Sequence, residues 1–307
     1  MITLLSTSDT DLRTAATCGA DYRVANPSRI LLDELPGLID GADLVVVRIL
    51  GGRRAWEEGL DAVLRQQVPV IVLSGELNPD PDLMALSTVP TGVAAQAHSY
   101  FVAGGHANLA AVHNFLSDTV LLPGLGFAPP VETPAWGVLE RTPSGSSSES
   151  SGSSSAVEMR VGVLYYRAQH LAGNTEYVDT LCAAIERHGA EAQAVFCASL
   201  RAADDDLIAH LGTFDALIVT VLAAGGTTPA TAGAGGDDEA WNVERLAALD
   251  IPILQGLCLT SSRDDWESQD DGVSPLDVAS QVAVPEFDGR IITVPFSFKE
   301  FDDNGLP

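Results

Sequence analysis

A chain of 307 residues is long enough for two ordinary domains, each able to bury its own apolar core. It carries 16 Lys and Arg against 42 Asp and Glu, a formal net charge of −26, so most of its surface would repel phosphate backbones and anionic membranes. We therefore expect neither nucleic acid nor a membrane as partner. The acidic surface suits cations, basic partner proteins or simple solubility.

Cysteine usage and the first residues bear on the cellular compartment. The four cysteines lie far apart and form no Cys-x-x-Cys pair, which predicts neither a zinc knuckle nor a disulfide framework. The first residues, MITLLSTSDTD, contain no basic segment, and no apolar run reaches the roughly 18 residues of a membrane span. We expect a cytoplasmic protein in a reducing compartment.

The first half of the chain alternates short apolar runs with helical stretches. Such runs occupy 2–5, 44–49 and 69–73, and each is followed closely by Ser, Asp or Gly residues that turn the chain. From 92 to 119 the apolar spacing becomes helical, and a proline-rich segment follows. Continuous apolar strands alternating with helices predict a parallel sheet covered on both faces.

A stretch of low complexity interrupts this pattern. Residues 144–155 contain only Ser, Gly and one Glu, a composition that cannot bury a core and that behaves as a flexible coil. We therefore expect a head unit over 1–140, a flexible linker over 141–158 and a second unit over 159–307.

The same alternation resumes after the linker. Apolar strands are predicted at 160–165, 192–196, 216–222, 252–255 and 291–294, with helices predicted at 175–188, 204–211 and 241–248. This rhythm is typical of a doubly wound sheet. The predicted fold class is α/β, with two Rossmann-like (flavodoxin-like) parallel-sheet units in tandem.

Ligands of doubly wound sheets bind beyond the carboxyl ends of the strands, and the first strand of the second unit is followed by Tyr166, Arg167, His170 and Asn174. A guanidinium can bind a carboxylate through two hydrogen bonds, and an imidazole can bind metal or move protons near neutral pH. The asparagine can cap the next helix. A purely structural role for Arg167 and His170 is the alternative interpretation.

A glycine-rich segment, 223–241, lies where a phosphate-binding loop would be expected, between a strand and a helix. It lacks the Gly-Lys-Ser/Thr motif and any cation, and it ends in Asp237, Asp238 and Glu239. Two interpretations fit better than nucleotide binding. One is a mobile loop with an acidic helix start, and the other is a site for a divalent metal or a basic partner.

Three further patterns in the sequence involve residues capable of catalysis or metal binding. Glu286 and Asp288 flank Phe287, which we expect to be buried, before a turn at Gly289 that leads into a strand. The histidines at 98, 106 and 113 lack the spacing of a metal site. The serines at 6, 8, 261 and 262 lack a Gly-x-Ser-x-Gly context, so no serine nucleophile is predicted.

Several segments together resemble a known family. They are LYYRAQHLAGN (164–174), GGDDEAWNV (235–243), PILQGLCLTSS (252–262) and SPLDVASQVAVPEFDGRIITVPFSFKE (274–300), with STSDTDL (6–12) and VVVRILGGRRAWEEGLD (45–61) in the first half. The chain resembles the CobN family, the large subunits of ATP-dependent cobaltochelatase, over nearly its whole length except the Ser/Gly insert. YYRAQHLAGN and VPEFDG are also similar to the related magnesium chelatase H subunits.

The resemblance implies a subunit that binds hydrogenobyrinic acid a,c-diamide and inserts Co(II), its substrate metal, during aerobic cobalamin biosynthesis. Members of the family work with AAA+ subunits of the CobS and CobT type, which hydrolyse ATP, and the lack of a P-loop here agrees with that division. Family members are several times longer. The resemblance therefore implies the N-terminal part of a metal–tetrapyrrole ligase, inactive by itself.

The resemblance also implies roles for the residues singled out above. Substrate binding would fall to Tyr166, stacking on the macrocycle, to Arg167, pairing with a peripheral carboxylate, and to Asn174. His170 and Glu286 would be catalytic, assisting metal or proton transfer, and the metal would meet Asp237, Asp238 and Glu239.

Three other functions stay open at this stage. They are a non-catalytic docking head whose acidic surface contacts the AAA+ subunits, a magnesium chelatase H-type subunit, and a nucleotide-binding enzyme built on the Rossmann-like units.

Overall fold

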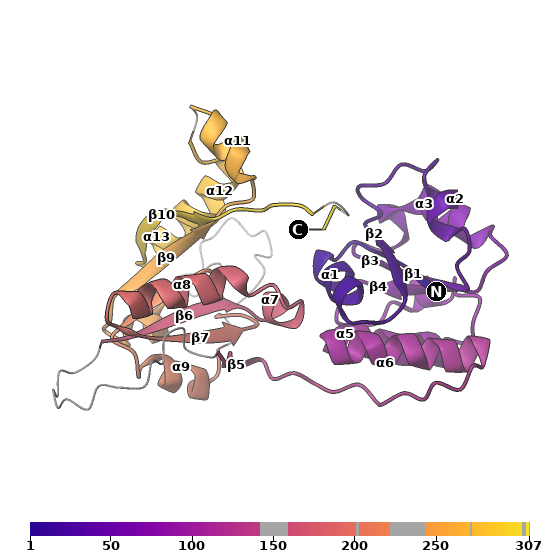
Figure 1. Ribbon diagram of the computed structural model, residues 1–307, viewed down its shortest axis with the longest axis horizontal. Helices are drawn as coiled ribbons and strands as arrows, with labels where there is room; N and C mark the ends of the chain where they lie inside the picture. The colour runs from indigo at the N-terminus through magenta and orange to yellow at the C-terminus, as the bar shows by residue number, and fades with distance from the viewer. Residues whose placement is uncertain (142–158, 201–202, 222–242, 271, 303–304, 307) are drawn as a thin grey trace, which may run out of the picture. The chain divides into compact units, whose positions relative to one another are not determined.

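The computed structural model describes residues 1–141, 159–200, 203–221, 243–270, 272–302 and 305–306 (Figure 1). The chain divides into two compact units. Unit 1 comprises Met1–Thr133, Leu171–Gly173 and Asp302–Pro307, and unit 2 comprises Pro134–His170 and Asn174–Phe301. Of the expected linker over 141–158, only Arg141 is among the described residues, and 142–158 lie outside them.

Unit 1 contains a four-stranded parallel sheet, as the alternation of apolar runs predicts. Its strands are β1 (Ile2–Ser6), β2 (Tyr22–Ala25), β3 (Leu44–Ile49) and β4 (Val70–Ser74), in the order β2-β1-β3-β4. Leu4 of β1 is in register with Val24 of β2 and Val46 of β3. The first strand, β1, lies inside the sheet, with β2 on one side and β3 on the other. The direction in which successive strands are added therefore changes between β1 and β3, as in flavodoxin-like folds.

Helices cover both faces of this sheet. They are α1 (Asp9–Thr17), α2 (Leu35–Ile39), η1 (Arg53–Ala55), α3 (Glu57–Leu64), α4 (Pro81–Met84), α5 (Thr91–Ala103), α6 (His106–Leu116) and the π-helical turn η2 (Ser117–Leu121). Successive strand residues point to opposite faces, so Leu4 belongs to the core under α1, α5 and α6, while Leu5 belongs to the core under α2 and α3.

Unit 2 contains a six-stranded sheet in the order β10-β9-β8-β6-β7-β5. Its strands are β5 (Trp136–Val138), β6 (Arg160–Tyr166), β7 (Glu191–Cys197), β8 (Ala216–Val219), β9 (Ile253–Cys258) and β10 (Ile291–Ser297). Strands β6 to β10 run parallel, which confirms the predicted α/β class of two Rossmann-like units in tandem.

Strand β5 differs from the expectation in two ways. It falls within the expected head region 1–140, yet it pairs with β7 in unit 2, and the pairing is antiparallel. Gly137 makes this pairing possible, because a Cβ atom there would lie 2.7 Å from Cζ of the Phe196 ring. A glycine lets the edge strand approach an aromatic side chain that any larger residue would displace.

The helices of unit 2 again lie on both faces of the sheet. They are α7 (Arg167–Leu171), α8 (Glu176–Arg187), α9 (Asp205–Leu211), α10 (Glu244–Ala247), α11 (Arg263–Ser268), α12 (Pro275–Asp277), the π-helical turn η4 (Val278–Ala283) and α13 (Val284–Phe287). One core includes Val163 and Val178 on α8, and the other includes Leu164 and Leu207 on α9. No described helix combines the length and apolarity needed to cross a bilayer.

The segment before β10 corrects one expectation. Phe287 was expected to be buried, but its side chain is 72% exposed, whereas Asp288 and Arg290 are buried. The reason is helical geometry. Ser274 caps a helical run that continues through α12, η4 and α13, so the buried face is set by a helical period rather than by strand alternation. The expected turn at Gly289 is present, with φ of 75°.

Candidate functional site

Each sheet has one place where its strand order reverses, and parallel sheets bind ligands in the crevice there, beyond the carboxyl ends of the strands. In unit 1 this place lies between β1 and β3, and in unit 2 it lies between β6 and β8. Tyr166 and Arg167 stand at the end of β6, as the sequence predicts.

In unit 2, strand β6 passes directly into α7, so Tyr166 is the last residue of the strand and Arg167 the first of the helix. Both side chains are half-buried. The Arg167 Nε donates a hydrogen bond to the Pro134 carbonyl at 2.9 Å, and burial lowers the pKa of this guanidinium from its ordinary value. Arg167 is therefore held at the strand end rather than extended into solvent.

His170 lies in the last turn of α7 and is fixed by two aromatic neighbours. Its ring stacks on Phe196 of β7, with centroids 4.0 Å apart and planes at 16°, and its Nδ1 lies 3.1 Å from the Tyr165 hydroxyl. Burial, and then the charge of Arg167, lower the pKa of His170. The imidazole is thus neutral at pH 7, the form that accepts a proton or binds a metal.

Helix α7 is held in place by its neighbour α8. The Tyr177 hydroxyl donates to Gln169 Oε1 at 2.6 Å and lies 3.4 Å from Thr220 Oγ1, just past β8. The Thr220 hydroxyl in turn donates to the Leu164 carbonyl of β6 at 3.1 Å. This chain of hydrogen bonds joins the ends of β6 and β8 to the helix that carries His170.

Asn174 does not cap α8 as expected. The helix begins at Glu176, its N-cap residue is Thr175, and no side chain caps it. The backbone N–H of Asn174 instead donates to the Gln169 carbonyl at 2.9 Å, which closes α7. The asparagine therefore lies in the turn between the two helices, four positions beyond His170.

The remaining candidate residues are not brought into this group. Glu286 is exposed on α13, which leads into β10, and β9 and β8 separate β10 from β6. Asp237, Asp238 and Glu239 lie outside the described residues. Within the described residues, no three His, Cys, Asp or Glu side chains are placed to hold a metal ion together.

A buried polar network that sequence reasoning missed lies beside the end of β6. Arg290 and Asp288 form an ion pair at 2.7 Å, and both side chains are 0% exposed. Nη1 of Arg290 also donates to the Val221 carbonyl and to Gln255 Oε1, each at 2.7 Å. The Gln255 amide donates to Gln281 Oε1 at 3.1 Å. The network ties β10, β9, the exit of β8 and η4 together.

Tyr166 also affects the pKa of Arg290 in this network. Burial lowers the pKa of Arg290, while Asp288 and then Tyr166 and Cys197 raise it. A guanidinium nevertheless stays charged at pH 7, and the Asp288 carboxylate balances that charge within the network. The sequence contained a signal for this network, because Gln255 is a polar residue in the apolar run PILQGLC and therefore needs a buried partner.

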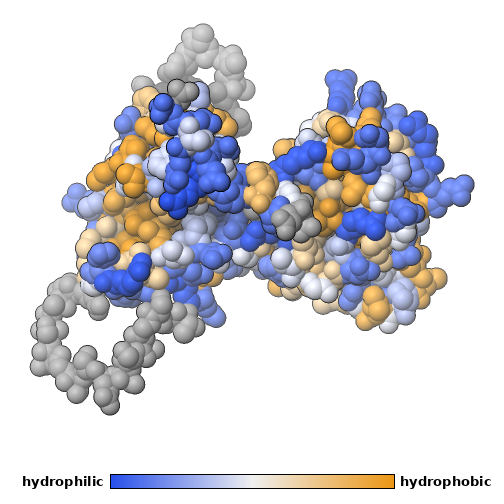
Figure 2. All heavy atoms as spheres, turned by 45° about the horizontal axis from the view of Figure 1, so that its top comes forward, coloured by the Kyte–Doolittle hydropathy of each residue, from blue (hydrophilic) through white to orange (hydrophobic). Residues whose placement is uncertain are grey.

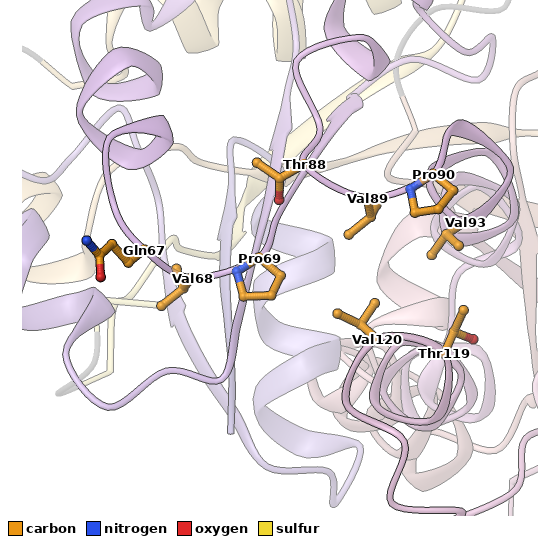
Figure 3. A pocket seen from close by; sticks show the side chains of 9 residues that line it. All are labelled: Gln67, Val68, Pro69, Thr88, Val89, Pro90, Val93, Thr119 and Val120. Carbon is orange, nitrogen blue, oxygen red and sulfur yellow. The ribbon is translucent and has the colours of Figure 1, made fainter.

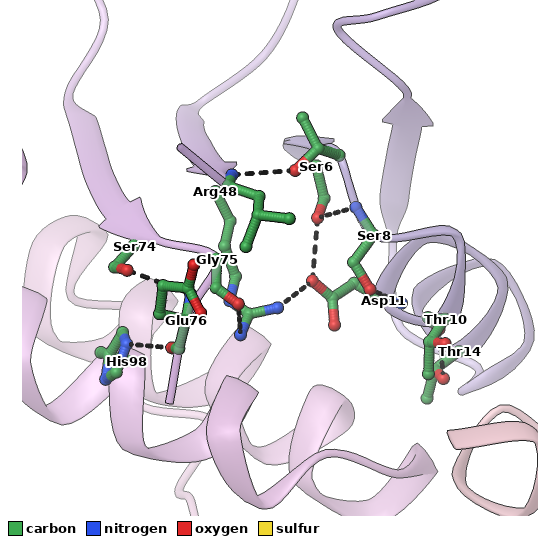
Figure 4. A network of polar contacts seen from close by, with 12 residues as sticks. Ser6, Ser8, Thr10, Asp11, Thr14, Arg48, Ser74, Gly75, Glu76 and His98 are labelled. Atoms are coloured by element: carbon green, nitrogen blue, oxygen red, sulfur yellow. Dashed lines mark hydrogen bonds and ion pairs between the residues drawn. The ribbon is translucent and has the colours of Figure 1, made fainter. Parts of the chain in front are cut away.

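Unit 1 has a comparable buried arginine at the carboxyl end of its sheet (Figure 4). Arg48 of β3 donates to the Asp11 carboxylate of α1 at 2.5 Å, with both side chains under 10% exposed, and to the Gly75 carbonyl at 3.0 Å. The Ser6 hydroxyl of β1 donates to the same Asp11 oxygen at 2.8 Å. Nε of Arg48 is buried and has no hydrogen-bond partner.

His98 of α5 lies on the same side of unit 1 (Figure 4). Its Nε2 is 3.1 Å from the Glu76 carbonyl, just past β4, and its side chain is buried. Burial is the main cause that lowers the pKa of His98, and Arg48 adds to the lowering. The serines 6 and 8, together with His98, thus serve hydrogen bonding within the fold.

Unit 1 also contains an apolar pocket of about 480 Å³ at the opposite end of its sheet (Figure 3). It lies where β4 begins, between the start of α5 and the turn η2, and Val68, Val89, Val93 and Val120 line it. No charged side chain lines it, so this pocket offers no acid–base or metal chemistry.

Comparison with known proteins relates the chain to metal chelatases. A family model described as CobN/Magnesium Chelatase matches residues 98–306. The aerobic cobaltochelatase subunit CobN of a Sinorhizobium species is 29% identical over 97% of this chain, and that of Pseudomonas aeruginosa is 27% identical over 84%. The solved catalytic subunit of cobaltochelatase from Mycobacterium tuberculosis is 60% identical over 99% of the chain, with a TM-score of 0.83.

These relatives are much longer than the chain. The matched part is 25% of the Sinorhizobium protein, 20% of the Pseudomonas protein and 25% of the Mycobacterium chain. The chain therefore spans a quarter or less of the length of these relatives.

A first prediction concerns the Arg48–Asp11 ion pair. Replacing one partner leaves the other buried without a counter-charge, which costs about 3–5 kcal/mol. We expect Arg48→Met to lower the free energy of unfolding of unit 1 by that amount. Arg48→Met combined with Asp11→Leu should cost less than the sum of the single changes, because no unpaired charge remains. Urea denaturation followed by the NMR signal of the Trp56 indole N–H, in unit 1, measures this, and strictly additive losses would contradict it.

A second prediction concerns His98 and pH. Its pKa is lowered in the folded state, so its contribution to stability is complete above the unfolded-state pKa of about 6.5 and is lost as the pH falls below that value. We expect His98→Gln to flatten the decline of unit 1 stability between pH 7 and 5. NMR titration of the His98 ring should give a midpoint below about 6.5. A midpoint at or above that value would show that burial does not control the pKa of His98.

Proposed function

Because the chain belongs to the CobN/magnesium chelatase family, we propose that it forms part of a cobaltochelatase large subunit, which binds hydrogenobyrinic acid a,c-diamide and inserts Co(II). The 60% identity to the Mycobacterium catalytic subunit over 99% of the chain supports the cobalt enzyme over a magnesium chelatase H-type subunit. ATP would be hydrolysed by AAA+ partner subunits of the CobS and CobT type and not by this chain.

Metal insertion sets clear chemical demands. Insertion of Co(II) breaks the inner N–H bond of the corrin ring and forms Co–N bonds, and the released proton passes to an acceptor. The reaction requires proton acceptors near the ring and exchange of the water ligands of Co(II). Co(II) is a substrate here, so a protein site needs to deliver the ion rather than retain it.

The environment of His170 is the observation that supports a contribution of unit 2 to metal insertion. The imidazole is neutral, lies between Tyr165 and Phe196, and sits one helical turn from Arg167. A neutral imidazole can accept a pyrrole proton or pass Co(II) to the ring. We assign His170 this role.

The neighbouring residues supply recognition. Arg167 would pair with a peripheral carboxylate of the macrocycle, because guanidinium groups bind carboxylates through two charge-assisted hydrogen bonds. Tyr166 would stack on the ring, and Asn174 would donate a hydrogen bond from the turn after α7.

The acidic candidates are assigned peripheral roles. Glu286, exposed on α13 away from the β6 end, would assist metal or proton transfer from the periphery. Asp237, Asp238 and Glu239 would attract Co(II) before transfer, since carboxylate oxygens suit divalent cations.

A third prediction tests these roles in the full subunit with its AAA+ partners. Loss of a charge-assisted hydrogen bond costs about 1.5–3 kcal/mol, so Arg167→Ala should weaken binding of hydrogenobyrinic acid a,c-diamide by about tenfold or more. Loss of an acid–base group costs about 10²–10⁴ in rate, so His170→Ala should lower turnover by that factor while binding is retained. Fluorescence titration and cobalt-insertion assays measure the two effects.

Matched controls separate chemistry from folding. Arg187→Ala and His188→Ala change the same residue types at exposed positions at the end of α8 and should leave both quantities unchanged. If Arg167→Ala and His170→Ala behave like these controls, unit 2 does not contribute to the reaction centre.

A second candidate function is docking of the AAA+ subunits, and the net charge of −26 favours it. An acidic surface attracts a basic partner, and salt screens that attraction over about 8 Å at physiological ionic strength. As a fourth prediction, the 307-residue chain should retain the AAA+ subunits in a pull-down at low salt and release them at about 1 M salt. Retention that does not depend on salt, or no retention at low salt, would reject docking through charge.

A further inference from the structure

An apolar face lies on unit 2 around its edge strand β10. Val294 and Ile291 of the strand are 73% and 55% exposed, and Phe287 of the preceding helix α13 is 72% exposed. Leu276 and Val278, at the junction of α12 and η4, extend it. Figure 2 shows apolar side chains gathered over this part of unit 2. We call these five residues the β10 face.

An edge strand of this kind is unusual at a free surface. Strand β10 has seven residues, IITVPFS, and none is charged. Natural sheets protect their edges with charges, bulges, prolines or a covering segment, because a bare apolar edge pairs with other chains. β10 has Pro295 and an irregular register near it, but no charged side chain that would repel a partner.

The backbone of the β10 face is held in place by contacts with the rest of unit 2. Asp288 and Arg290, which join α13 to β10, form a fully buried ion pair, and Arg290 is bonded to Gln255 of β9. The Thr293 hydroxyl donates to the Gln255 carbonyl at 2.6 Å. These contacts fix the backbone that presents the exposed apolar side chains, so a partner would meet a preformed surface.

The net charge of the chain and the composition of the β10 face indicate which kind of partner would bind this face. Two copies of a chain with net charge −26 repel each other, which disfavours self-association. Transient partners are usually selected through charged and polar contacts, whereas permanent interfaces resemble a protein core. None of the five residues of the β10 face is charged, and Glu286 beside Phe287 lies at its border, so the face has the character of a permanent interface.

The relatives indicate what that permanent partner is. The matched part is 25% of the Sinorhizobium protein, so 75% of that polypeptide lies outside it. We propose that the β10 face is a docking surface for the polypeptide that CobN-type subunits carry outside the region matched by this chain, packed in the same subunit. This inference rests on family membership and not on the roles assigned to His170 and Arg167.

A fifth prediction tests the proposal by comparing the 307-residue chain with a full-length subunit that carries this region. Hydrogen exchange of peptides covering 284–297 should be slower in the full-length subunit by about tenfold or more, because covered edges open less often. Val294→Asp should remove that protection in the full-length subunit. It should change little in the 307-residue chain, where the side chain already contacts water.

Two further variants complete the test. Phe287→Asp lies on α13 outside the sheet, so it should act like Val294→Asp even if an aspartate harms strand pairing. Leu77→Asp makes the same change at a 75% exposed residue of unit 1 and should leave exchange over 284–297 unaltered. Equal exchange in the two proteins would overturn the proposal. A 307-residue chain that dimerises in sedimentation and becomes monomeric with Val294→Asp would also overturn it, in favour of a second copy.

Discussion

Two-sided burial of parallel strands is the constraint on which both units depend. Strands such as LVVVRI (44–49) and RVGVLYY (160–166) bury both faces, so helices must cover each side of each sheet and the loops must gather at the strand ends. The candidate site residues Tyr166 and Arg167 accordingly lie at such an end. Tyr166 and Arg167 owe their position to this rule, because they are the first residues of the chain beyond the buried part of β6.

Each unit uses one buried arginine to hold the strand ends together. Arg48 in unit 1 pairs with Asp11 and donates to the Gly75 carbonyl beyond β4, and Arg290 in unit 2 pairs with Asp288 and donates to the Val221 carbonyl beyond β8. Carbonyl groups beyond the end of a strand have lost their ladder partners, and a guanidinium with five donors can satisfy several acceptors at once. Such pairs add little net stability, but they fix which segments meet.

This architecture has consequences for a chelatase. A metal-inserting subunit must hold a large planar substrate, remove protons from it and admit a metal ion, and the end of β6 offers one neutral imidazole, one oriented guanidinium and one phenol ring. That set can recognise the edge of a macrocycle and move a proton. Within the described residues, no three His, Cys, Asp or Glu side chains are placed to hold a metal ion there.

The sequence by itself determined the α/β class, the two parallel sheets and the place of Tyr166, Arg167 and His170, because these depend on local periodicity and on the short distance along the chain from a strand to its first helix. It also carried the family resemblance in segments such as YYRAQHLAGN. Tertiary structure alone decided that β5 joins unit 2, that Phe287 is exposed and Asp288 buried, and that Arg290 reaches Val221 and Gln255. Those outcomes depend on contacts between residues up to 69 positions apart, and no local pattern records which distant acceptor a buried donor will find.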